Sequence, residues 1–501
     1  MFALRGGDME SPRYPLLYEI NTRVRLSDLA LELGRAATLD DIPDEELDRL
    51  ALTGFDWVWF LGVWQTGPAG RQVALSHAEL RREYFQTLPD FTEADVSGSC
   101  FSVQAYEVHR DFGGNAALAR LRERLHRRNL RLMLDFVANH TAPDHRWVGC
   151  HPEYYVHGTE VHLVVEPQNY ARVLTSQGPV ILAYGRDPYF PGWSDTLQLN
   201  YGNPELQDAM AGELNVIAEM CDGLRCDMAM LLLPDVFERT WGIQSEPFWA
   251  KAIGKVRSRH PEFLFMAEVY WDLEWAMQQQ GFDYAYDKRL YDRLRGQHPR
   301  SIRDHLRAGL EFQNRLARFL ENHDEPRAAS VFTPPMHRAA AVLSFLSPGL
   351  RFFHMGQLEG LRTRIPLQLR RGPIEPPDPE TQNFYGRLLG CLRESVFRCG
   401  NWRLLECKPA WDGNWTWDSM IACAWHDGTD GLYAVVINYA SHDSQCYLPL
   451  PLDGLRGASW KLQDMMSEAV YHRDRDSMIS PGLYLDMPPW GYHVFRLTID
   501  D

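Results

Sequence analysis

The sequence lacks the features that mark membrane-spanning, secreted or disulfide-linked proteins. No run approaches the ~20 apolar residues that cross a bilayer, and the N-terminus, MFALRGGDMESPRYP, has no apolar core of signal-peptide length. The nine cysteines form no CxxC pair, and an odd number scattered in this way predicts free thiols. We therefore expect a cytoplasmic protein without a membrane partner.

The sequence also has fewer positive than negative charges. Lys and Arg number 51 against 67 Asp and Glu, a net charge of -16, and a field of that sign repels phosphate backbones. Nucleic acid is therefore not expected as a partner. Hydrophobic residues make up 45% and charged residues 24%, which is typical of a folded globular chain, and neither an internal repeat nor a low-complexity tract is evident.

Short apolar runs alternate with longer amphipathic stretches from Leu16 to Arg393. This alternation is typical of parallel strands connected by covering helices, and eight such strands predict a closed (β/α)8 TIM barrel. The eight runs begin at Pro15 (PLLYEI), Asp56 (DWVWFLGVW), Leu130 (LRLMLDFVA), Gly223 (GLRCDMAM), Phe263 (FLFMAEV), Phe282 (FDYAYD), Leu316 (LARFLEN) and Leu350 (LRFFHMG).

Two further regions interrupt or follow the barrel pattern. Residues 141–203, after the third strand, are too long for an ordinary barrel loop and predict a small inserted subdomain. Residues 399–501 show short alternating segments separated by Gly, Asp and Pro, which predict a C-terminal antiparallel β-sandwich. The barrel then comprises residues 1–140 and 204–398.

Charged residues stand at the carboxyl ends of the predicted strands, where barrel enzymes place their catalytic groups. Arg225 and Asp227 are two apart on one strand and so point to the same face. A guanidinium beside a carboxylate favours the ionised form, which can act as a nucleophile. Glu268, on the next strand, is a candidate general acid because a negative Asp227 hinders loss of its proton. Asp324 supplies a third carboxylate.

Each of these residues also has a purely structural interpretation. Arg225 with Asp227 can be an ion pair at the barrel rim, and His140 and His323 can be hydrogen-bonded structural histidines. Asp135 inside an apolar strand can be a buried acceptor for backbone donors. A purely structural account must place three carboxylates, an arginine and two histidines at one rim by chance, so we favour glycosidic bond cleavage, which needs paired carboxylates.

Four short motifs in this order resemble those of glycoside hydrolase family 13, the α-amylase family. They are LDFVANH ending at His140, GLRCD ending at Asp227, AEV around Glu268, and NHD ending at Asp324. The stretch from Gly98, GSCFSVQAYEVHRDFGG, is similar to the family's loop after the second strand. The resemblance covers Leu16 to Arg393 and implies a (β/α)8-barrel glycosidase.

Carried over by position, the resemblance implies that Asp227 is the nucleophile, Glu268 the acid/base and Asp324 the transition-state stabiliser. It also implies that Arg225, His140 and His323 bind sugar hydroxyls or the charged residues around the reacting carbon. The resemblance further implies that Phe101 would stack beneath that sugar ring; the family's usual residue there is Tyr, so Phe101 keeps the stacking face and loses a hydroxyl.

Two departures from the family pattern bear on function. Met230 and Leu231 stand where amylases of the family commonly carry Lys and His, which predicts an unusual acceptor side. Asn139 matches a calcium ligand of the family, but Ca²⁺ needs several oxygen ligands and no others are in register, so no metal or cofactor is predicted.

We expect a retaining enzyme that hydrolyses α-glucosidic bonds in an α-glucan or oligosaccharide through a glycosyl-Asp227 intermediate. A transglycosylase of the same family uses the same intermediate and is the first alternative. A non-catalytic sugar-binding relative is the second, and a metal-dependent barrel hydrolase is disfavoured because the first strand has no paired-histidine motif. Substrate length, linkage and oligomeric state stay open.

Overall fold

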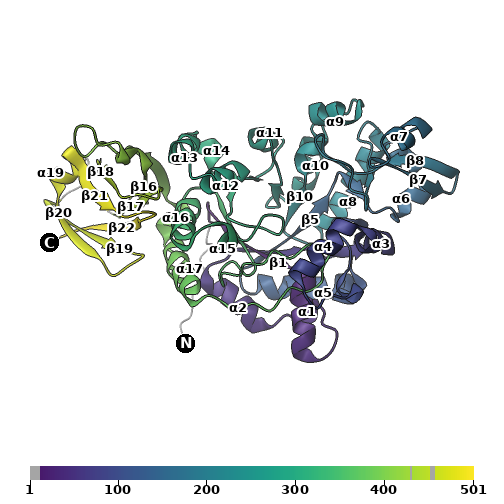
Figure 1. Cartoon of the computed structure of the whole chain (residues 1–501), viewed down its shortest axis with the longest axis horizontal. Coiled ribbons are helices and arrows are strands. Elements are labelled where there is room, and N and C mark those ends of the chain that lie inside the picture. Colours follow the sequence, from purple (N-terminus) through teal and green to yellow (C-terminus); the bar gives the residue numbers. More distant parts are fainter. Residues whose placement is uncertain (1–11, 429–430, 452–456, 501) are drawn as a thin grey trace.

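Eight parallel strands close into a barrel, which forms the central part of the computed structural model (Figure 1). The structure describes residues 12–428, 431–451 and 457–500. Around the barrel the strand order is β1-β14-β13-β12-β11-β10-β5-β2. The bounds are β1 Leu16–Asn21, β2 Trp57–Leu61, β5 Arg131–Val137, β10 Gly223–Asp227, β11 Leu264–Ala267, β12 Tyr284–Tyr286, β13 Leu316–Arg318 and β14 Leu350–His354. All eight predicted strands are confirmed.

The barrel strands are mostly apolar because both of their faces are covered. Every residue of β1, β2, β10 and β14 is buried. The few charges in these strands, such as Glu19 and Arg225, are fully buried as well. Burying a charge costs free energy unless the charge is paired, so buried charges in these strands indicate a functional site.

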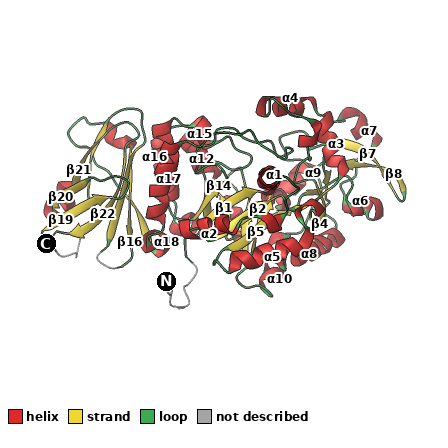
Figure 2. Ribbon diagram, turned by 90° about the horizontal axis from the view of Figure 1, so that it is seen from below, coloured by secondary structure: helices red, strands yellow, loops and turns green. Residues whose placement is uncertain are grey.

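Helices in the connections surround the barrel (Figure 2). The start of helix α8 is set by local sequence. Pro204 occupies its first turn, and the Asn203 side chain caps it by accepting a hydrogen bond from the Glu205 amide. The main covering helices are α1 Thr22–Leu33, α2 Asp44–Thr53, α5 Gly114–His126, α8 Pro204–Ala218, α9 Pro234–Trp241, α10 Trp249–Arg257, α11 Glu274–Gln279, α12 Lys288–Arg295, α13 Pro299–Leu306, α16 Pro334–Phe345, α17 Pro379–Leu392 and α18 Ser395–Cys399.

The long connection after β5 carries its own small elements, at the end of the molecule far from the C-terminal sheet (Figure 1). Strands β7 and β8 form an antiparallel hairpin, and β6 pairs with β9. The elements are β6 His140–Thr141, α6 Arg146–Cys150, α7 Glu160–Val165, β7 Tyr170–Thr175, β8 Gly178–Ala183 and β9 Leu197–Gln198. The connection after β2 is also elaborate, with β3 Trp64–Thr66, α3 Pro68–Ser76, α4 Ala78–Thr87 and β4 Val103–Val108.

The C-terminal part is an antiparallel β domain. A six-stranded sheet, ordered β15-β16-β17-β22-β19-β20, packs its side chains into one apolar cluster with those of the pair β18-β21. The bounds are β15 Asn401–Leu405, β16 Met420–His426, β17 Leu432–Asn438, β18 Ser444–Leu448, β19 Ser459–Asp464, β20 Val470–Asp474, β21 Leu483–Met487 and β22 Tyr492–Ile499. The domain divisions at 140/141, 203/204 and 398/399 stay a prediction. Within the described ranges, no helix combines the length and the apolar character that crossing a membrane requires.

Candidate active site

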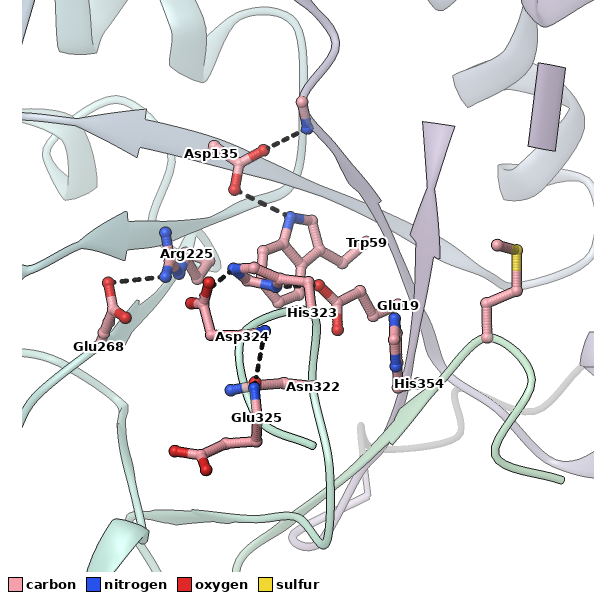
Figure 3. Close-up of polar contacts among 12 residues, drawn as sticks. Glu19, Trp59, Asp135, Arg225, Glu268, Asn322, His323, Asp324, Glu325 and His354 are labelled. Carbon is pink, nitrogen blue, oxygen red and sulfur yellow. Dashed lines mark hydrogen bonds and ion pairs between the residues drawn. The ribbon is translucent and has the colours of Figure 1, made fainter. Parts of the chain in front are cut away.

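Three carboxylates reach the same end of the barrel from three strands. Asp227 is the last residue of β10, Glu268 directly follows β11, and Asp324 lies in the loop after β13. The carboxyl ends of parallel barrel strands open at one rim, so residues far apart in sequence meet there. Figure 3 shows Glu268 and Asp324 on either side of Arg225. The side chains of Asp227 and Glu268 are 6% and 3% exposed, whereas the Asp324 side chain is 38% exposed. The site is therefore a buried pair beside a more open third acid.

Arg225 joins the two buried carboxylates. Its Nη1 lies 2.7 Å from Asp227 Oδ1, and its Nη2 lies 2.6 Å from Glu268 Oε2. The guanidinium is fully buried, and its Nε donates a hydrogen bond to the Tyr286 hydroxyl at 3.3 Å. A planar guanidinium fixes the direction of two carboxylates at once, which a lysine cannot do. The two charges in strand β10 thus form one paired cluster with Glu268.

Glu268 has a partner on each oxygen. The Met228 backbone N–H donates to Oε2 at 2.7 Å, and the Tyr270 hydroxyl donates to Oε1 at 2.8 Å. Met228 has a φ of 41°, a left-handed conformation that is unusual for a residue other than glycine. Such strain gathers at functional sites, and here it turns the amide after Asp227 toward the neighbouring acid.

Burial dominates the acidity of the two inner carboxyls. It raises the pKa of Glu268 to about 7, with the negative Asp227 and Asp324 adding to the rise and Arg225 opposing it. Glu268 thus shows the expected direction, but burial is a larger cause than Asp227. Burial also raises the pKa of Asp227, against the lowering effect of Arg225. Arg225 favours the ionised form of Asp227, as expected, but the larger effect of burial was left out of that expectation.

His323 lies between two carboxylates. Its Nδ1 is 2.5 Å from Glu19 Oε1 on β1, and its Nε2 is 3.0 Å from Asp324 Oδ2 (Figure 3). Burial alone would lower the pKa of His323, but Asp324 and Glu19 raise it well above its usual value. Burial tends to raise the pKa of Asp324, yet the charge and contact of His323 bring it down to about 2. At neutral pH this arrangement is an imidazolium held by two carboxylates.

Two aromatic or imidazole side chains complete the predicted set. Phe101 is half-buried, with its ring centroid 5.0 Å from the Arg225 guanidinium carbon and 5.5 Å from the His323 ring. His140 is 4% exposed, and its ring lies 5.3 Å from that of Trp193. Burial lowers the pKa of His140 to about 4, so this histidine is neutral at pH 7.

Asp135 is a buried structural acceptor, as its position inside an apolar strand predicts. It accepts hydrogen bonds from Trp59 Nε1 at 3.2 Å and from the Gly62 backbone N–H at 2.7 Å. Burial raises the pKa of its carboxyl to about 7. Asp135 lies opposite Arg225 in the backbone register of β5 and β10.

The residue types around Asn139 do not fit a calcium site. Its side-chain oxygen accepts a hydrogen bond from Gln198 Nε2 at 2.9 Å, and its Nδ2 donates back to Gln198 Oε1 at 3.2 Å. Ca²⁺ needs six to eight oxygen ligands. Over the described part of the chain, no group of three or more His, Cys, Asp and Glu residues is placed to hold a metal.

Met230 and Leu231, which the family pattern places at the acceptor side, lie a few residues after Asp227 in the chain. They belong to a short 3₁₀ turn after β10, and both side chains are buried, at 0% and 3% exposure. Both residues belong to the main apolar cluster of the molecule. Because Asp227 and Glu268 are buried to a similar degree, this burial does not separate them from the site, and the unusual acceptor side stays a prediction.

Three contributors to the site had no sequence motif to mark them. Glu19 reaches His323 from the first strand, Tyr270 contacts Glu268, and Tyr286 contacts Arg225. A charge inside the apolar run PLLYEI was the one available signal for Glu19. The tyrosines are typical of any buried strand end and gave no signal.

The fold and the site define a (β/α)8-barrel protein with a cluster of three carboxylates, an arginine and a histidine at the carboxyl ends of its strands. A family model described as "Alpha amylase, catalytic domain" matches residues 100–368, just over half of the 501 residues. The chain therefore belongs to the α-amylase family, glycoside hydrolase family 13, as its motifs indicated.

The sequence relatives of this chain are distant, and a solved structure shares its fold. Alpha-amylase 3 of Dictyoglomus thermophilum is 23% identical over 304 residues, which cover 54% of this chain and 56% of that protein. An alpha-1,4-glucan:maltose-1-phosphate maltosyltransferase of Cereibacter sphaeroides is 24% identical over 271 residues, 52% of this chain and 33% of that protein. A maltogenic alpha-amylase from Thermotoga neapolitana has the same fold, with a TM-score of 0.68, 18% identity, and 97% and 99% of the two chains covered. This chain spans about half or less of the length of the two curated relatives.

Proposed function

We propose that this enzyme cleaves α-glucosidic bonds with retention of configuration, through a covalent glycosyl intermediate on Asp227. The observation that carries this proposal is the contact of one buried guanidinium, that of Arg225, with both Asp227 and Glu268. Retaining glycosidases hold their two carboxyls ~5–5.5 Å apart, close enough for one to attack the anomeric carbon while the other protonates the leaving oxygen.

The electrostatics supports a division of roles. With a pKa of about 7, Glu268 keeps its proton on a large fraction of molecules at neutral pH and can donate it to the glycosidic oxygen. Arg225 stabilises the negative charge of Asp227 that attack requires. Asp324 stays ionised beside His323 and is the most exposed of the three acids, so it suits contact with a sugar ring that gains positive charge.

The substrate class that we propose is a neutral α-glucan or oligosaccharide, and water is the proposed acceptor. Transfer to a sugar hydroxyl is the alternative, because the relatives include a protein named as a maltosyltransferase. The two outcomes share the intermediate and differ in which acceptor reaches it. The size of the products formed from maltooligosaccharides separates them, since transfer gives chains longer than the substrate.

Proton NMR of the first product tests the proposal. A retaining reaction on an α-glucoside releases the α-anomer before mutarotation, because two inversions at one carbon restore the configuration. Initial appearance of the β-anomer would reject the intermediate on Asp227, whichever acceptor is used.

A further inference from the structure

A long loop after β14 crosses to the connection that follows β2. The loop comprises residues 355–378, between β14 and α17. Its Gln368 backbone oxygen accepts a hydrogen bond from the Ser97 N–H at 2.8 Å, and its Arg370 N–H donates to the Asp95 backbone oxygen at 2.9 Å. Ser97 and Asp95 follow helix α4 in the connection from β2 to β5. Backbone hydrogen bonds therefore join two segments that are far apart in sequence.

An apolar cluster and an ion pair strengthen this contact. Leu369 is fully buried, in a cluster that includes Tyr84 of α4. Nε of Arg371 lies 2.6 Å from Oδ1 of Asp95. Backbone, apolar and charged contacts together hold the loop in one place. The two joined segments, which we call the wall, are residues 78–98 and 360–372.

The wall stands on the side of the barrel opposite Glu268. In the closed strand order, β11 lies four places from β1 in either direction, and Glu268 directly follows β11. The wall is built from the connections after β14 and β2, which are the two neighbours of β1. Figure 3 shows Glu268 and Glu19, from β1, on opposite sides of Asp324. The wall therefore faces the proposed acid/base across the site.

The wall also approaches the third carboxylate. Arg327, three residues after Asp324, donates a hydrogen bond from Nε to the Thr363 backbone oxygen at 3.2 Å. Arg364 follows directly, and its side chain is 34% exposed. Burial raises the pKa of Asp324, His323 is the main cause of its fall to about 2, and the charge of Arg364 lowers it further. The Arg364 guanidinium thus lies near Asp324 and is accessible to a ligand.

The segment that carries Phe101 has the same anchor as the wall. Arg23 of α1 is buried, and it donates hydrogen bonds to Ser97 Oγ at 3.2 Å and to Thr66 Oγ1 at 3.0 Å. Phe101 follows Ser97 by four residues, and its N–H donates to Ser99 Oγ at 3.2 Å. The ring on which a sugar would stack is therefore held beside the wall.

The position of the wall decides which end of a substrate it meets. In an α-1,4-glucan, C1 of the reacting sugar carries the leaving oxygen, and O4, at the opposite end of the ring, is joined to the next sugar toward the non-reducing end. Because the proposed role of Glu268 is to protonate the leaving oxygen, C1 faces Glu268 and O4 faces the wall. A terminal sugar presents a free O4 hydroxyl there, which can accept a hydrogen bond from a guanidinium. A sugar within the chain presents a further sugar, which meets the wall.

We propose that the wall limits this enzyme to the non-reducing end of its substrate, with Arg364 donating a hydrogen bond to a hydroxyl of the terminal sugar. The contact of Arg364 with Glu83 of α4 orients the guanidinium. This proposal rests on the α-glucoside activity proposed above and deepens it, because it names the chain end as the part of the substrate that reacts. The interior of a glucan is then left intact.

Maltoheptaose with a 4,6-O-ethylidene group on its non-reducing-end sugar tests the proposal on the full-length chain. We expect kcat/KM for this blocked substrate to lie roughly 100-fold or more below that for free maltoheptaose, because a site that binds a free hydroxyl rejects an analogue that lacks it. β-Cyclodextrin, which has no chain end, should not be cleaved. Cleavage of the blocked chain or of β-cyclodextrin at a rate close to that of maltoheptaose overturns the proposal.

Arg364→Ala tests the residue. Loss of a charged hydrogen bond should lower kcat/KM for maltoheptaose roughly 10- to 100-fold and reduce the discrimination against the blocked substrate. Arg338→Ala is the matched control, because Arg338 of α16 is 33% exposed, forms an ion pair with Glu380 and lies outside the wall. It should leave both values as in the wild type.

An unchanged kcat/KM in Arg364→Ala overturns the role of Arg364. The comparison of blocked and free substrate uses the wild type, so it decides the role of the wall even if the variant does not fold. No turnover of free maltoheptaose, or an inverted product, would instead reject the α-glucoside activity itself.

Discussion

Arg225 and Glu268 are in direct contact, with Nη2 of the guanidinium 2.6 Å from Oε2 of the carboxylate, while the other terminal nitrogen of Arg225 holds Asp227. The cation is fully buried. Its two contacts therefore act in a region where electrostatic interactions are stronger than in water. One side chain thus holds both inner acids in position and lowers the pKa of each against the larger effect of burial.

Arg225→Lys should impair catalysis because an ammonium cannot span both carboxylates. Loss of one charged hydrogen bond costs about 1.5–3 kcal/mol, so kcat/KM should fall on the order of 10- to 100-fold. Steady-state kinetics on a maltooligosaccharide measures this fall in kcat/KM. Arg351→Lys is the matched control, because Arg351 is also fully buried. Its guanidinium donates hydrogen bonds to the backbone oxygens of Tyr14, Phe345 and Phe397. This variant should therefore lose thermal stability and keep kcat/KM.

The pH dependence of kcat/KM should show a basic limb near the pKa of Glu268, about 7. The acid must carry a proton to serve the leaving group, so activity is present below this pH and is lost as the pH rises through it. Glu268→Gln should remove this limb. It should also spare the first step with α-glucosyl fluoride, because fluoride leaves without a proton. A basic limb unchanged in Glu268→Gln would assign the acid elsewhere.

Glu19→Gln should lower the pKa of His323 by removing one of the two charges that raise it. A folded-state pKa above the unfolded value of about 6.5 contributes stability that is fully present below pH 6.5 and is lost as the pH rises through the folded value. The melting temperature of the variant should therefore differ most from that of the wild type below pH 6.5. NMR titration of the histidine ring protons measures the shift directly.

His140 is the internal control for that titration, since burial, and no carboxylate partner, sets its pKa at about 4. Its resonance should titrate identically in the wild type and in Glu19→Gln. If the His323 titration is unchanged in the variant, Glu19 does not hold the imidazolium.

The strand pattern and the motif residues could be predicted because each depends on local sequence. The apolar runs from Pro15 to Leu350 mark strands covered on both faces, and all eight lie in the barrel. Arg225 and Asp227 share a face because strand side chains alternate, which sequence spacing alone determines. The contact of Arg225 with Glu268 was not predicted, and it depends on the adjacent positions of β10 and β11 in the barrel.

Properties that depend on burial could not be predicted from local sequence. The pKa of Asp227 is raised, although the neighbouring Arg225 predicts the reverse, because desolvation depends on the whole barrel. Met230 and Leu231 follow Asp227 in sequence, yet the turn after Met228 directs them into the core. Glu19 lies more than 300 residues from His323 in sequence, and no local pattern indicates that contact.

Trapping of the covalent intermediate tests the central claim most directly. In Glu268→Gln, α-glucosyl fluoride can form the intermediate, but no general base activates water to release it. Acid quenching, proteolysis and mass spectrometry should then find one glucosyl group on the peptide that contains Asp227, and none in the double variant that also carries Asp227→Asn. A glucosyl group on another residue, or turnover of the fluoride by the double variant at the rate of Glu268→Gln alone, would contradict the assignment of Asp227 as the nucleophile.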